Sequence, residues 1–107
     1  MEQLKALPEP AQSAVLGSAL GASASMLGFD NASVVTSAIG YGALSGVAAW
    51  IAPMLTADPN FQLGAAGAVG AGVSMIDSAA VAEYLPMGML GNAAVPAASL
   101  YLVRAMK

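Results

Sequence analysis

The chain has 107 residues, of which 58% are hydrophobic and only 8% are charged, and its net charge is −3. It contains no cysteine and no histidine, which excludes disulfide frameworks, thiol chemistry, zinc clusters and the usual general base. The acidic balance argues against nucleic acid as a partner, because nucleic-acid binding needs a basic surface. An ordinary soluble domain is about 25% charged, so this composition favours a single membrane-embedded domain, residues 1–107.

The few charged residues divide the chain into apolar segments rich in Ala, Gly, Ser, Val and Leu. These segments are roughly 17–25 residues long, about what a helix needs to cross ~30 Å of hydrocarbon. The sequence therefore predicts an all-α fold, an integral membrane four-helix bundle, with helices at about 11–29, 32–56, 59–76 and 78–106. Because alanine is the most frequent of the apolar residues, a soluble, tightly packed assembly protein is the alternative.

Small polar residues and prolines mark the expected turns. Asp58 and Pro59 suit an N-cap followed by the first helical position, and Asp30 and Asp77 are placed to cap the second and fourth helices. Asp30 and Asp77 are 47 positions apart, as are Gly17 and Gly64. The spacing indicates two repeated helical hairpins, which are common in membrane folds. Chance matching in an Ala/Gly-rich sequence explains it equally well.

The basic residues predict the orientation. Lys5, Arg104 and Lys107 are the only ones, and all three lie near the termini. An even number of crossings places both termini on the same side of the membrane, and the positive-inside tendency makes that side cytoplasmic.

Small residues recur every four positions in three of the expected helices. In lipid the hydrophobic effect does not draw helices together, so close backbone packing must. Glycine also lowers helix propensity by about 1 kcal/mol relative to alanine, so its recurrence predicts tight helix packing, both within the chain and between copies. Generic low-complexity composition is the alternative. The residues are Ser13, Gly17, Gly21 and Ser25 in the first helix, Ala38, Gly42 and Gly46 in the second, and Gly64, Ala68 and Gly72 in the third.

Three residues stand out inside the expected helices. Pro96 frees the carbonyl group of Asn92 and should kink the fourth helix, and the Asn92 side chain is able to bond across helices. Tyr41 lies in mid-helix, where its hydroxyl needs a partner inside the bundle or faces a crevice. A kink with a polar amide can line a pore, although such residues more often adjust packing.

Two carboxylates are the remaining candidates for chemistry. An intramembrane carboxylate is a functional candidate by default, but the match between Asp77 and Asp30 favours a turn, and Glu83 is expected near the headgroups. The sequence shows no nucleophile–base pair, metal-ligand cluster or phosphate loop. We therefore expect no enzymatic activity, catalytic residue, cofactor or metal.

In size and hydropathy, with Gly17/Gly21 and Gly42/Gly46 as its densest features, the chain resembles the small hydrophobic membrane proteins of tailless icosahedral bacteriophages with an internal membrane, of the corticovirus and tectivirus kind. The resemblance implies a structural virion component that forms a homo-oligomer or lattice and organises the membrane under the capsid. Its expected partners are the lipid bilayer, other copies, and capsid or other membrane proteins.

The alternative function is a holin-like pore-forming protein of the bacterial inner membrane. Phage holins are similar in length and oligomerise to breach that membrane. This chain departs from their pattern because Arg104 and Lys107 are all that it has of a basic C-terminal tail.

Overall fold

The computed structural model describes residues 6–28, 33–76, 79–85 and 88–106. Every regular element in these ranges is an α-helix, which confirms the all-α prediction. The elements are α2 (Glu9–Met26), α3 (Val34–Leu55), α4 (Pro59–Ser74), the short α5 (Ala79–Tyr84) and α6 (Gly88–Ala105).

Local capping chemistry determines where the helices begin. The Ser33 hydroxyl accepts a hydrogen bond from the Thr36 N–H at 3.1 Å, so Ser33 caps α3 in place of the expected Asp30, which lies outside the described residues. Asp58 caps α4, because its Oδ1 accepts from the Asn60 N–H at 2.9 Å. Both caps satisfy backbone donors that have no partner within the helix.

The single helix expected over 78–106 is corrected to two helices, α5 and α6. Leu85 lies outside both, and Gly88 begins α6 with φ +77°, a conformation that favours glycine. In the sequence Leu85 precedes Pro86, and a residue before proline is disfavoured in the α conformation. Asp77, expected as a cap, lies outside the described residues.

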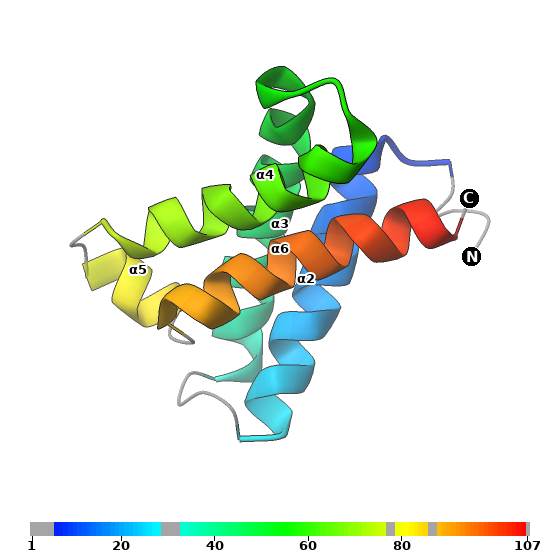
Figure 1. Cartoon of the computed structure of the whole chain (residues 1–107). Helices are drawn as coiled ribbons and strands as arrows, with labels where there is room; N and C mark the ends of the chain where they lie inside the picture. The colour runs from blue at the N-terminus through cyan, green and yellow to red at the C-terminus, as the bar shows by residue number, and fades with distance from the viewer. Residues whose placement is uncertain (1–5, 29–32, 77–78, 86–87, 107) are drawn as a thin grey trace.

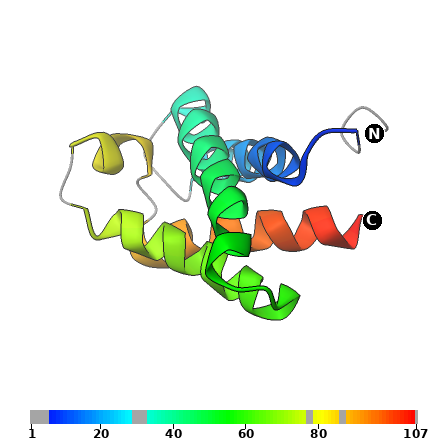
Figure 2. The ribbon, with the colours of Figure 1, turned by 90° about the horizontal axis from the view of Figure 1, so that it is seen from above.

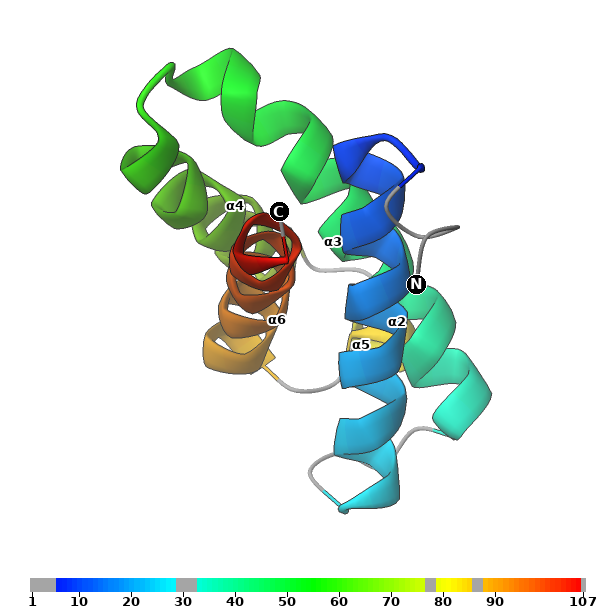
Figure 3. The same ribbon diagram turned by 90° about the vertical axis from the view of Figure 1, so that its right-hand side faces the viewer.

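The long helices form two hairpins that cross. Figures 1 and 3 show α2 side by side with α3, and α4 side by side with α6, with the second pair lying across the first. Figure 2 shows α5 close to α3, at one end of the second hairpin. This arrangement differs from a bundle of nearly parallel helices. The helices of the two hairpins run in different directions, so both hairpins cannot stand perpendicular to the same plane.

Glycines bring the backbones of α2 and α3 close together. A Cβ on Gly17 would overlap the Ser45 side chain, and a Cβ on Gly21 would lie 2.5 Å from the Ser37 carbonyl oxygen. Such contacts are possible only without a side chain, so these predicted packing residues hold the first hairpin together inside the chain. Two glycines of α3 face α2 in the same interface: Gly42 and Gly46.

The second hairpin uses a different face of α4 from the expected one. A Cβ on Gly70 would overlap the Asn92 carbonyl oxygen of α6, and Ala66 is also buried. The small residues that were expected to pack, Gly64, Ala68 and Gly72, are exposed instead. A Cβ added to Gly64 or Gly72 would meet open space. A helix turns about 100° per residue, so a two-residue offset moves a row nearly to the opposite side. The residues affected by this correction are Gly64, Ala68 and Gly72.

The interior is built mainly from small side chains. Ala48, Ala49, Ala52, Ala66 and Leu100 form the buried apolar cluster. Many large apolar side chains face outward instead, including some that are almost fully exposed. The most exposed are Leu90 (85%), Met75 (74%), Met26 and Leu27 (73% each) and Phe61 (70%).

Candidate functional site

Buried polar side chains lie where the two hairpins meet. We call Tyr41 and Ser45 of α3 together with Asn92 and Ser99 of α6 the polar seam. Each of the four is at most 1% exposed. Buried polar groups are unfavourable unless they are hydrogen-bonded, so their partners determine what the seam does.

Asn92 is the centre of the seam. Its Oδ1 accepts a hydrogen bond from the Tyr41 hydroxyl at 2.5 Å, and its Nδ2 donates to Ser74 Oγ at 2.6 Å and to the Leu85 carbonyl oxygen at 3.0 Å. One amide thus joins α3, α4 and the residue after α5 to α6. A network in which each member has a partner fixes a single arrangement of the elements around it.

A second contact joins α3 and α6 further along the seam. The Ser99 hydroxyl donates to the Val95 carbonyl oxygen at 2.7 Å, and its Oγ lies 3.3 Å from the Ser45 Oγ. Ser13 of α2 is fully buried as well, and its Oγ makes no hydrogen bond to any residue that the structure describes.

Arg104 joins three helices at the far end of α6. It donates to the Pro59 carbonyl oxygen at 3.0 Å and to the Gln62 side chain, and it forms an ion pair with Glu9 at 3.1 Å. The Gln62 amide in turn donates to the Thr56 carbonyl oxygen at 2.9 Å. The start of α2 and the end of α6 therefore lie together on one side of the molecule.

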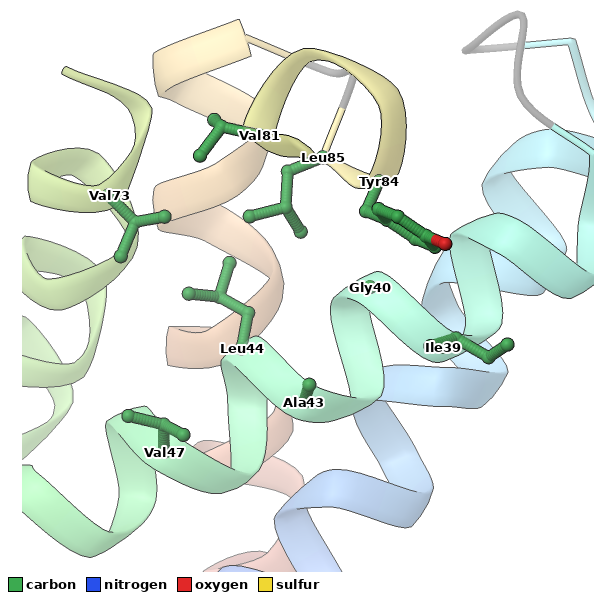
Figure 4. A pocket seen from close by; sticks show the side chains of 9 residues that line it. All are labelled: Ile39, Gly40, Ala43, Leu44, Val47, Val73, Val81, Tyr84 and Leu85. Carbon is green, nitrogen blue, oxygen red and sulfur yellow. The ribbon is translucent and has the colours of Figure 1, made fainter. Parts of the chain in front are cut away.

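An apolar pocket of about 400 Å³ lies between α3, α4 and α5 (Figure 4). Almost all of its accessible lining is apolar, and none of the lining side chains is charged. The pocket is open toward the surface rather than enclosed. Its lining residues are Ile39, Gly40, Ala43, Leu44, Val47, Val73, Val81, Tyr84 and Leu85.

The structure brings together only some of the residues expected to be functional. Asn92 and Tyr41 are hydrogen-bonded to each other, and Pro96 is buried within α6, which continues unbroken to Ala105. Glu83 is exposed. The Ser45–Ser99 contact and the contacts of Arg104 were not expected from the sequence. Both join residues that are far apart in the chain, and the local sequence does not indicate such partners.

The seam offers hydroxyl and amide groups rather than acids and bases. Among the described residues, Asp and Glu side chains do not gather in groups that could hold a metal ion. The seam is thus suited to hydrogen bonding between helices. That the protein is not an enzyme stays a prediction.

One helix in the described ranges, Val34–Leu55, is long and apolar enough to cross a membrane by length and composition. This supports the membrane prediction weakly, because the core helix of a soluble protein passes the same test. In comparisons with known proteins, no family model, curated protein or solved structure matches this chain.

Proposed function

We propose that this chain is a non-enzymatic structural protein of a lipid bilayer. The observation that carries the proposal is the distribution of its side chains: most large apolar residues face outward, whereas the interior is mainly alanine, glycine and serine with Asn92. The few large apolar side chains buried among them are Tyr41, Leu44, Leu100 and Val103. In water such exposure opposes the main driving force of folding and marks a surface that is normally covered. In lipid the exposed side chains are solvated, and close backbone contacts with hydrogen bonds hold helices together.

Both helices of the first hairpin are long enough to cross a bilayer, and α3 is also apolar enough. At 1.5 Å per residue, the 22 residues of α3 extend about 33 Å and the 18 residues of α2 about 27 Å, close to the ~30 Å of a hydrocarbon core. Because α4 and α6 cross this hairpin, they lie nearer to the membrane plane. The Glu9–Arg104 ion pair then marks the polar side of the membrane on which both described ends lie.

Association between copies is the second part of the proposal. The small-residue faces of α2 and α3 are occupied inside the chain, so the outward row on α4, Gly64, Ala68 and Gly72, is the one left for contact with another copy. We propose an oligomer or lattice in a viral internal membrane, under a capsid. The absence of a large polar domain in the described residues suits a protein whose work is packing.

Expression in bacteria tests the proposal. Membranes are floated on a density gradient, washed with alkaline carbonate and assayed for the protein, while membrane potential is followed after induction. We expect the protein to float, to resist extraction and to leave the potential intact. Abrupt loss of potential at a reproducible time would support the holin-like alternative, with Asn92, Pro96 and Tyr41 as pore candidates. Recovery as a lipid-free assembly would contradict a membrane location.

A further inference from the structure

We propose that the apolar pocket between α3, α4 and α5 holds one acyl chain of a phospholipid from the surrounding bilayer. The inference rests on the proposed membrane location and adds to it a defined lipid site. Figure 4 shows the side chains of Leu44, Val73, Val81 and Leu85 pointing into a common space. The first three come from α3, α4 and α5, and Leu85 is the residue after α5.

Two specific contacts hold α5 as one wall of the pocket. A Cβ on Gly40 would overlap the Tyr84 carbonyl oxygen, so the missing side chain lets the end of α5 lie directly against the backbone of α3. The next carbonyl oxygen, that of Leu85, accepts a hydrogen bond from Asn92 Nδ2 at 3.0 Å. Gly40 and Asn92 therefore hold α5 in the position that makes the pocket concave.

The chemistry of the lining determines the chemistry of the occupant. None of the lining side chains is charged, and in Figure 4 the Tyr84 hydroxyl points away from Leu44 and Val73. A charged or polar group placed here would lose its hydration without gaining partners. The occupant is therefore uncharged and apolar along the part that enters, which excludes an ion, a lipid headgroup or a charged peptide.

Size distinguishes an acyl chain from a second copy of the protein. A stable protein interface uses about 20–30 residues a side, and a helix with its side chains is about 10–12 Å across. This pocket has nine lining residues and a volume of about 400 Å³, within the range of small-molecule sites. At its rim Ile39 and Val47 are 58% and 47% exposed, so the pocket opens onto the outward apolar surface from which a lipid chain can enter.

Photocrosslinking in a bilayer tests the site. The protein is reconstituted into phosphatidylcholine vesicles that contain a trace of phosphatidylcholine with a diazirine in the middle of one acyl chain, irradiated, and mapped by mass spectrometry. Leu44 is only 5% exposed, whereas Leu90 is 85% exposed and serves as the reference for bulk lipid. We expect Leu85, which is partly exposed, to be labelled as strongly as Leu90, and Leu44 to be labelled detectably, because only a chain inside the pocket can reach it.

Two matched variants separate a pocket from general lipid contact. Ala43 is exposed within the pocket, so Ala43→Phe fills the space that the acyl chain would use, whereas Ala98→Phe adds the same group on an exposed position of α6. We expect Ala43→Phe to abolish labelling of Leu44 and to leave labelling of Leu90 unchanged, and Ala98→Phe to alter neither.

The outcomes separate this inference from the proposed function. Labelling of Leu90 without Leu44 in the unaltered protein would overturn the acyl-chain site while the membrane location stands. Labelling of Leu44 that persists in Ala43→Phe would overturn it as well. Labelling of neither residue would overturn both proposals.

Discussion

The Asn92 side chain uses all of its hydrogen-bonding groups within the protein. Its Oδ1 accepts from Tyr41, and its two N–H groups reach Ser74 and the Leu85 carbonyl oxygen. Because the residue is 1% exposed, water cannot replace a partner that is lost. A buried group left without a partner typically lowers stability by about 1–3 kcal/mol. The seam therefore depends on this one amide more than on any other group it contains.

Replacing Asn92 tests that dependence. We expect Asn92→Leu to lower the free energy of unfolding by about 2–4 kcal/mol, since Tyr41 and the Leu85 carbonyl both lose a partner. Tyr41→Phe should cost about 1–2 kcal/mol, and the two changes should not add, because they remove a shared contact. Unfolding in mixed micelles measures these differences. The control is Asn60→Ala at the exposed start of α4, expected within about 0.5 kcal/mol; an equal loss there would refute the role of Asn92.

At the scale of the helices, register decides which small residues pack. The sequence repeat of 47 aligns Gly17 with Gly64, but the buried positions of α4 come 49 residues after their counterparts on α2. These counterparts are Ser13 and Gln62, Gly17 and Ala66, and Gly21 and Gly70. Local sequence predicts that small residues pack and where α4 begins. It does not predict which face of a helix meets its partner, because that depends on contacts from distant segments.

Two alanine substitutions on equivalent-looking glycines should have opposite effects. Gly21→Ala places a Cβ 2.5 Å from the Ser37 carbonyl oxygen, which forces α2 and α3 apart and should cost about 1–3 kcal/mol. Gly64→Ala enters open space and should stabilise α4 by up to about 1 kcal/mol through helix propensity. Thermal unfolding in detergent measures both changes. If both substitutions raised the stability, or both lowered it, the packing of α2 and α4 described above would be contradicted.

The outward row of α4 can be tested separately for contact between copies. Ala68→Leu adds bulk at an exposed position, so it should leave unfolding nearly unchanged while reducing chemical cross-linking of copies in membranes. Ala98→Leu makes the same change at an exposed position of α6 and should not affect cross-linking. If both variants cross-link as the unaltered protein does, copies associate through some other surface or not at all.

At the scale of the whole molecule, the crossing of the hairpins follows from contacts between residues far apart in the chain. Ser45 bonds Ser99, and Glu9 pairs with Arg104. Composition and capping residues were enough to predict an all-α chain and nearly the right length for the first three long helices, but not the division of the last segment into α5 and α6. They could not predict the crossing, because the sequence around Ser45 or around Glu9 does not indicate which residue, more than 50 positions away, will be its partner.

Lysine substitutions along α3 test the membrane location of the whole molecule. Val47 lies near the middle of α3 and Leu55 at its end, and they are 47% and 62% exposed. In a bilayer, Val47→Lys places a charge near the centre, at a cost of about 2.5–3.5 kcal/mol on insertion scales. Lysine at Leu55 can extend its charge to the interface. We therefore expect Val47→Lys, and not Leu55→Lys, to reduce the protein retained in floated, carbonate-washed membranes.

In a soluble protein both positions face water, so both substitutions would change stability by at most about 0.5 kcal/mol. Equal retention of the two variants would therefore argue against α3 as a membrane span.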